Sequence, residues 1–211
     1  MRATLSLSAC LLLAGCGAGA GAAVPPPPPP PSPSTVAPAP EASSTPPNGQ
    51  DLLFAAMMIA HHGQAVRMSQ TLLGKTGVPE RVVAVADYIR ADQGREITEM
   101  NAWRVAWGSP AVSPDDPAAA RHGAGHGMMT EEQLAALAAA DGPAATRLYL
   151  EQMIEHHKGA ILMAKTVLKV GRNAYVRNLA KHIVNEQGAE NDVMTKLLAA
   201  PAASRDAGGA G

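Results

Sequence analysis

The chain contains almost no cysteine. Only two of its 211 residues are cysteines, Cys10 and Cys16, and both lie close to the N-terminus. The rest of the chain therefore has no thiol and no disulfide, so a metal site there must use histidine, methionine and oxygen ligands. A formal net charge of −1 also provides no basis for nucleic-acid binding.

Signatures of catalysis, strands and membrane spans are also missing. The sequence shows no nucleophilic triad, no phosphate-binding loop and no nucleotide fingerprint, so an enzyme is not predicted. No segment has a convincing strand pattern. The apolar run from Leu5 to Leu13 is too short to cross a bilayer as a mature helix.

The N-terminus is typical of an export signal. The apolar run ends at Leu13–Cys16, where Leu-Ala-Gly-Cys resembles a bacterial lipobox. In such proteins the peptidase cuts before the cysteine, which then carries the lipid. We predict a signal peptide at 1–15, a lipidated Cys16 and a membrane-anchored lipoprotein of the cell envelope, either on the outer side of the cytoplasmic membrane or in the periplasm. The alternative is an unlipidated secretory signal cut near Ala20 to Ala23.

Composition divides the remaining chain into three parts. Residues 16–50 are rich in Gly, Ala, Pro, Ser and Thr, with consecutive prolines from Pro25 to Pro31, which predicts a disordered linker with an extended proline run. Residues 51–200 have the size of one domain. Residues 201–211 are predicted to be a disordered tail.

The domain is predicted to be all-α. Long helices are expected at about 51–73, 79–107, 144–170 and 174–199. Residues 108–127 are expected to form a loop, and a capping box at Thr130 predicts a short helix through Ala140. Two similar helix–turn–helix units then predict a duplicated hairpin, closed into a ferritin-like four-helix bundle with a short extra helix in the crossover.

One helical motif occurs twice. The first copy reads Met58-Ile59-Ala60-His61-His62, and the second reads Met153-Ile154-Glu155-His156-His157. At about 100° of rotation per residue, methionines share the stripe of the first histidine in each copy. These methionines are Met57, Met58 and Met68 in the first copy and Met153 and Met163 in the second. The second histidine of each pair lies at the edge of the stripe or against a neighbouring helix.

A second motif is repeated on the helix that follows each twin-histidine helix. Gln93 and Glu96 precede Met100, and Gln187 and Glu190 precede Met194 at the same spacing. The glutamate and methionine stand four residues apart, so they share a helix face. Glu96, Met100, Glu190 and Met194 are therefore candidate ligands as well.

This residue set predicts copper binding. Thioether sulfur is a soft ligand that favours Cu(I), while imidazole binds copper in either oxidation state. We predict an exported copper-binding protein, with Cu(I) favoured and Ag(I) as a further soft ion, that sequesters or hands on the metal without catalysis. If histidines donate, affinity should fall as the pH drops through about 6.5. A homo-oligomer and a copper-transfer partner stay open.

The loop and one further histidine are ambiguous or unassigned. His122, His126, Met128 and Met129 either supply extra ligands or are solvated. His182 has no counterpart in the repeat and is predicted to be a surface residue.

Two other functions compete with copper binding. A ferritin-like di-iron oxidase would use Glu-x-x-His, but here Met58 and Met153 occupy the glutamate position. A structural or partner-binding lipoprotein would use its methionines only as core filling, and it would bind no metal tightly.

The repeated motifs and the Gly-Met-Met-Thr segment at Gly127 resemble the bacterial domain-of-unknown-function family 305 over about residues 51–198. This resemblance implies a CopM-like, ferritin-like bundle and copper or silver binding in the cell envelope, with no established reaction. The family's acid ten residues before the first histidine is matched by Asp51, but the second half has Thr146 there. Gly63 and Lys158 also differ, so equivalence of the two half-sites stays open.

Overall fold

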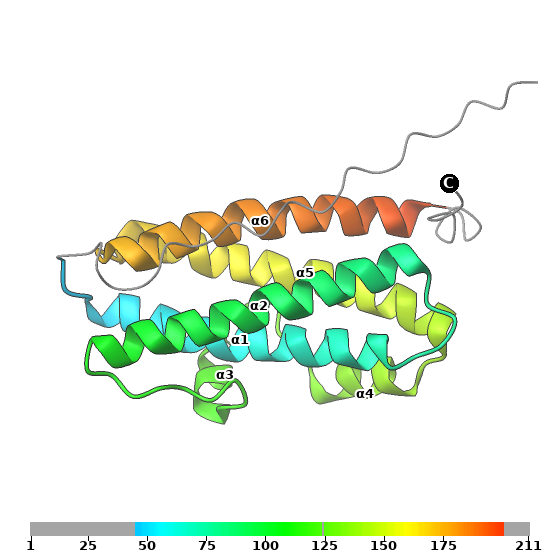
Figure 1. Ribbon diagram of the computed structural model, residues 1–211, viewed down its shortest axis with the longest axis horizontal. Helices are drawn as coiled ribbons and strands as arrows, with labels where there is room; N and C mark the ends of the chain where they lie inside the picture. The colour runs from blue at the N-terminus through cyan, green and yellow to red at the C-terminus, as the bar shows by residue number, and fades with distance from the viewer. Residues whose placement is uncertain (1–44, 124, 201–211) are drawn as a thin grey trace, which may run out of the picture.

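The computed structural model describes residues 45–123 and 125–200 (Figure 1). In these ranges the chain forms six helices and no strand: α1 Gly49–Leu73, α2 Glu80–Ala106, α3 Pro117–Gly123, α4 Glu131–Ala139, α5 Gly142–Val170 and α6 Ala174–Ala199. The predicted signal peptide, Cys16, nearly all of the linker and the tail lie outside the described residues. The all-α bundle is confirmed.

The long helices are arranged around a central pair. Helices α1 and α5 pack against each other, α2 packs on α1, and α6 packs on α5. The short helices α3 and α4 lie on the opposite side of this pair from α6 (Figure 1). The crossover between the halves therefore covers one side of the α1–α5 pair, and α2 and α6 cover the other.

Polar caps set the helix ends and explain two early starts. Asn48 accepts a hydrogen bond from the Asp51 N–H, and Asp51 accepts one from the Asn48 N–H, so α1 begins at Gly49 rather than at Asp51. Asp141 caps α5 in the same way through the Ala144 N–H, which starts that helix at Gly142.

The prediction of an uninterrupted loop at 108–127 is wrong, because α3 forms within it. The Asp116 carboxylate accepts hydrogen bonds from the N–H groups of Ala118 and Ala119, which are otherwise unpaired at a helix start. Pro117 is suited to the first helical position. An alanine run behind a capping aspartate is the local signal for this helix.

The apolar core consists of two clusters, one towards each end of the bundle. The first cluster contains Met58, Met100 and Met163, and the second contains Met68, Met153 and Met194. In the repeat, Met58, Met163 and Met100 correspond to Met153, Met68 and Met194. The two sets are therefore equivalent. The two hairpins are therefore related by a pseudo-two-fold axis that passes between α1 and α5, which run antiparallel.

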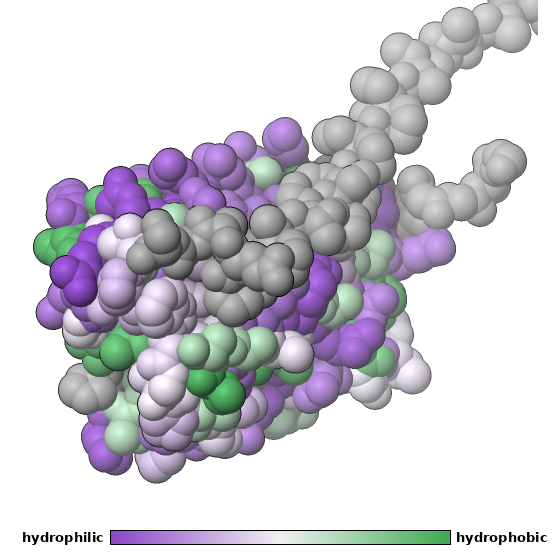
Figure 2. Space-filling model, turned by 60° about the vertical axis from the view of Figure 1, so that its left-hand side comes forward, coloured by the Kyte–Doolittle hydropathy of each residue, from purple (hydrophilic) through white to green (hydrophobic). Residues whose placement is uncertain are grey.

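The outer surface is largely polar. Figure 2 shows one face on which hydrophilic side chains predominate and hydrophobic ones form small separate groups. None of the helices within 45–123 and 125–200 combines the length and the apolar character that crossing a membrane requires.

Candidate metal site

Four histidines lie in the middle of the bundle, between the two apolar clusters. His61 is equally far from both ends of α1, and His156 is equally far from both ends of α5. His61, His62, His156 and His157 are all 0% exposed, and none belongs to either cluster. We call these four residues the histidine layer. The candidate site is therefore inside the bundle.

The imidazole rings of the layer lie close to one another. The ring centroids of His61 and His156 are 3.7 Å apart, and those of His156 and His157 are 6.3 Å apart. The first histidine of each motif thus meets its counterpart across the pseudo-two-fold axis. A single ion or a small group of ions at this point would be reached from both repeats.

Glutamates on the outer helices orient the second histidines. The Nε2–H of His62 donates to Glu96 Oε2 over 2.7 Å, and the Nε2–H of His157 donates to Glu190 Oε2 over 2.6 Å. Both carboxylates are almost fully buried. A carboxylate that holds one imidazole nitrogen fixes the tautomer and leaves the other nitrogen free to bind a metal.

The free ring nitrogens of the layer have no hydrogen-bond partner among the described residues. This holds for the Nδ1 atoms of His61, His62 and His157, and for both ring nitrogens of His156. Buried polar atoms are normally paired, and leaving one unpaired costs about 1–3 kcal/mol. These buried nitrogens are therefore available as metal ligands, although among the described residues no three of them come within 4.8 Å of one another.

Burial keeps three of the four histidines of the layer uncharged. It lowers the pKa of His61 and that of His157 to about 3, and that of His156 well below its usual range, and the neighbouring imidazoles lower these pKa values further. A hydrogen bond to the His126 carbonyl partly offsets this for His61. At neutral pH each of these three rings therefore keeps one nitrogen with a free lone pair, so competition from protons would begin far below the pH of about 6.5 expected from an exposed histidine.

Buried amides extend the polar layer onto the outer helices. Gln93 and Gln187 each stand one turn before a glutamate of the layer, and both are almost fully buried. The side-chain amide of Gln93 has no partner among the described residues, and neither does Oε1 of Gln187. The two copies of the Gln-x-x-Glu motif thus place two glutamines and two glutamates at the same level of the bundle as the histidines.

The predicted methionine ligands divide into two groups. Six are buried at 3% exposure or less and pack in the clusters on either side of the layer: Met58, Met68, Met100, Met153, Met163 and Met194. Met57 is only partly buried and, with His126 and Met163, lines a cavity of about 170 Å³ between α1 and α5. The cavity gathers sulfur and imidazole groups outside the layer.

The crossover closes one side of the layer. The Nε2–H of His61 donates to the His126 carbonyl over 2.9 Å. A side chain on Gly159 would overlap that same carbonyl oxygen, so only glycine permits this approach. Gln64 holds the next residues by accepting from the Met129 N–H and donating to its carbonyl. These contacts fix the loop over one side of the histidine layer.

The other candidate ligands on the crossover lie elsewhere. Met129 packs in the second apolar cluster. Met128 lines a different cavity, beside Arg67 and Pro114. His122 is in α3, and its side chain lies outside the described part of the structure. Only His126 of this group is placed next to the layer.

His182 is not a surface residue, contrary to prediction. Its side chain is 15% exposed, and its Nε2 lies 3.5 Å from Glu96 Oε1. His182 occupies the position on α6 that Tyr88 occupies on α2 when the two repeats are aligned at Glu96 and Glu190. The contact with Glu96 comes from the opposite helix, so no local pattern indicated it.

Comparison with known proteins identifies relatives for nearly the whole domain. The family model described as Domain of unknown function (DUF305) matches residues 51–198. A DUF305 fragment from Deinococcus radiodurans is 31% identical, with a TM-score of 0.65, over 74% of this chain and 99% of that one. A DUF305 protein from Streptomyces coelicolor, named as secreted, is 35% identical, with a TM-score of 0.64, over 71% of this chain and 92% of that one.

The solved relatives include metal complexes. CopM in the Cu(I)-bound form is 30% identical, with a TM-score of 0.56, over 69% of this chain and 93% of that one. CopM in the Cu(II)-bound form is 31% identical, with a TM-score of 0.59, over 71% of this chain and 95% of that one. A search of curated proteins gives no match.

Proposed function

The chain belongs to the DUF305 family, and from this premise we propose that it binds copper, chiefly as Cu(I), in its central histidine layer. Binding serves to sequester the metal or to hand it on, and no catalytic step is part of the proposal. Ag(I) is expected to bind at the same site because it is also soft.

One observation carries this proposal. Five imidazole nitrogens in the layer are buried and lack a hydrogen-bond partner among the described residues. Their environment keeps His61, His156 and His157 neutral, which is the form that binds metals. Burying unpaired polar atoms costs free energy, and a bound ion that offset this cost would account for their presence.

The surroundings favour copper over harder ions. Three buried methionines lie in the first cluster that borders the layer and four in the second, and thioether sulfur is a soft ligand suited to Cu(I). The two carboxylates at the layer, Glu96 and Glu190, are engaged by His62 and His157. The relatives support the same choice, since CopM is known in Cu(I)-bound, Cu(II)-bound and Ag-bound forms.

We propose that a metal ion reaches the layer from the cavity beside the crossover. Met57, Met163 and His126 line it, and the His126 carbonyl contacts His61. A soft ion that enters there would exchange thioether and imidazole ligands on its way inwards. We assign Met57 and His126 to loading, and the four buried histidines to storage.

Anaerobic Cu(I) titration of the purified protein against a chromogenic chelator tests the proposal. The double variant His61→Gln/His156→Gln should lower Cu(I) affinity by about 100-fold or more, since it removes the imidazoles that meet at the axis. Ser69→Ala is the matched control, because Ser69 is also fully buried but lies away from the layer.

Two results would reject the proposal. Failure of the native protein to take Cu(I) from the chelator would leave the layer without a metal. Equal Cu(I) affinity in the double variant and in the Ser69→Ala control would remove His61 and His156 from the site. Circular dichroism of each variant establishes that a loss of affinity is not a loss of fold.

We also propose attachment to the cell envelope through Cys16. Support comes from the Leu-Ala-Gly-Cys sequence that ends at this residue and from the relative named as secreted. Cys16→Ala should move the protein from the membrane fraction to the soluble fraction. Retention of the variant in the membrane fraction would contradict lipid anchoring at this position.

A further inference from the structure

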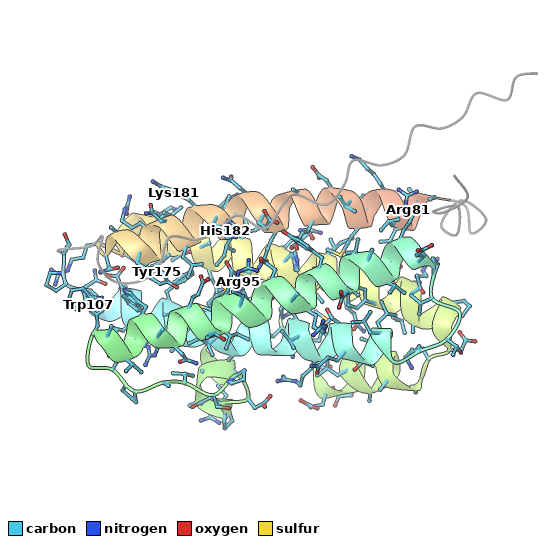
Figure 3. All side chains as sticks on the ribbon, in the orientation of Figure 1. Arg81, Arg95, Trp107, Tyr175, Lys181 and His182 are labelled. Atoms are coloured by element: carbon cyan, nitrogen blue, oxygen red, sulfur yellow. The ribbon has the colours of Figure 1, made fainter. Side chains whose placement is uncertain are left out.

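A second group of metal-binding side chains lies between α2 and α6, outside the histidine layer. Asp92 and Glu96 come from α2 and His182 comes from α6, and one donor atom of each lies within 4.8 Å of the others. Figure 3 shows His182 and Arg95 in the space between these two helices. The two helices are joined here by long side chains rather than by close backbone packing.

Two of these donor atoms are buried and unpaired. Glu96 is 2% exposed; its Oε2 is bound by His62, while its Oε1 has no hydrogen-bond partner among the described residues. His182 Nε2 is likewise buried without such a partner. Both atoms point to the same place, because they lie 3.5 Å apart. A nearly buried carboxylate therefore directs a free oxygen at a free imidazole nitrogen.

The 3.5 Å separation fits a shared metal ion. It is long for a charge-assisted hydrogen bond, which is normally about 2.7–2.9 Å. Two ligands held about 2.1 Å from one tetrahedral ion are about 3.4 Å apart. The gap between Glu96 Oε1 and His182 Nε2 is thus the distance that an ion bound to both would set.

The local charge also favours a cation. Arg95 pairs with Asp92 and lies within 3.8 Å of Glu99. From α6, the Glu186 carboxylate also lies against α2, where it accepts a hydrogen bond from the Tyr88 hydroxyl. One arginine therefore stands against several carboxylates.

From this geometry we infer that Asp92, Glu96 and His182 form a second metal site, specific for a divalent transition-metal ion such as Zn(II). Two carboxylates and one imidazole are borderline-hard donors, and no thioether is among them, so the site disfavours Cu(I) and Ag(I). Three protein ligands leave the fourth tetrahedral position to water. We call this group the outer site.

Within the described residues, the other half of the molecule has no equivalent site. The residues that correspond to Asp92, Glu96 and His182 there are Glu186, Glu190 and Tyr88. The Tyr88 hydroxyl donates a hydrogen bond to Glu186, which closes that position without a metal. The exchange of histidine for tyrosine therefore limits the protein to one outer site.

The outer site shares Glu96 with the histidine layer. One oxygen of Glu96 orients His62, and the other belongs to the outer site. The inference nevertheless does not depend on copper binding, because Asp92 and His182 take no part in the layer and the outer site favours a different class of metal.

Calorimetric Zn(II) titration of the metal-free purified protein tests the outer site. His182→Tyr installs the residue of the other half, and Asp92→Asn preserves side-chain shape. Each should lower Zn(II) affinity at one site by about 100-fold or more, so that one fewer Zn(II) binds per chain than in the native protein. Tyr88→Phe is the matched control and should leave Zn(II) binding unchanged.

The possible results separate this inference from the proposed function. Equal Zn(II) stoichiometry and affinity in the native protein, His182→Tyr and Asp92→Asn would overturn the outer site. So would the absence of Zn(II) binding by the native protein. Cu(I) affinity measured on His182→Tyr should stay within about threefold of native. Loss of Cu(I) binding in the His61→Gln/His156→Gln variant concerns only the layer.

Discussion

The two halves of the molecule match in the central layer and diverge at several positions outside it. Each half contributes two histidines and one glutamate to the same buried level of the bundle, with hydrogen bonds of nearly equal length to the glutamates. Outside this level, some equivalent positions carry different chemistry. Duplication therefore produced two equivalent sides of one site. Outside that site, residues of the two halves differ where they contact different neighbours.

The apolar clusters show this divergence at a pair of positions. In the second cluster the hydroxyls of Ser69 and Tyr149 share a hydrogen bond of 2.9 Å. Their counterparts in the first cluster are Ala164 and Phe54, which have no hydroxyl groups. Both hydroxyls are present in one cluster and both are absent from the other, as the cost of an unpaired buried hydroxyl requires.

The helix starts differ in a second way. Asp51 near the start of α1 accepts from the N–H groups of Arg172 and Asn173, so it ties this helix to the α5–α6 turn. Its counterpart Thr146 only donates to the Gly142 carbonyl within its own helix. Asp51 thus has a structural role in the first half, which Thr146 does not repeat in the second half.

The largest expected effect comes from a substitution that disrupts the close contact between the crossover and α5. Gly159→Ala places a methyl group on the His126 carbonyl oxygen and should lower the free energy of unfolding by more than about 3 kcal/mol. Gln64→Ala, at the equivalent position of the first half, should lower it by only about 1–2 kcal/mol, because it removes hydrogen bonds and causes no overlap.

Urea unfolding of both variants measures this difference. Lys158→Ala, next to Gly159 but exposed, is the control and should change stability by less than about 0.5 kcal/mol. A Gly159→Ala variant as stable as the control would mean that the crossover does not rest on α5 in solution.

The next effect concerns pH and sharpens the comparison of the two histidine pairs. Burial lowers the pKa of His61 in the first half, and of His156 and His157 in the second. In the unfolded chain these groups take up protons below pH 6.5, but in the folded protein they do not. Their contribution to stability is therefore present above pH 6.5 and is lost as the pH falls towards 3.

Each such group changes the free energy of unfolding by up to about 1.4 kcal/mol per pH unit in that window. His156→Gln/His157→Gln should flatten the profile of the metal-free protein between pH 6 and 4.5 by about 2.7 kcal/mol per unit, and His61→Gln by about half as much. Burial raises the pKa of Glu190, which acts in the opposite direction above pH 4.5 and is present in every variant. Urea unfolding at several pH values gives the slopes, and identical slopes in all variants would refute neutral buried histidines.

The smallest expected effect comes from giving one pair of positions in the second cluster the residues found in the first. Ser69→Ala and Tyr149→Phe should each cost about 1 kcal/mol, because each leaves a buried hydroxyl without its partner. The double variant should cost less than the sum by about 1 kcal/mol, since it reproduces the Ala164 and Phe54 pair. A double-mutant cycle in urea measures this coupling. Strict additivity would show that the hydroxyls do not interact.

Local sequence patterns determined the helices and most of the candidate ligands. Caps and turn residues marked the four long helices to within about two residues, and the short helix after Thr130 as well. The twin histidines and the Gln-x-x-Glu motif were visible because both are repeated. Such signals are local, since one helix turn already fixes which residues share a face.

Only the tertiary structure decided how these faces meet. Periodicity placed His61 and Met58 on one stripe, but burial of His61 against His156 and the His126 carbonyl depends on residues far along the chain. The outer site likewise joins Glu96 to His182 across two helices. The ligand types and the helices follow from nearest neighbours in sequence, whereas burial, lowered pKa values and unpaired nitrogens arise from long-range packing, which a single sequence does not encode in any local pattern.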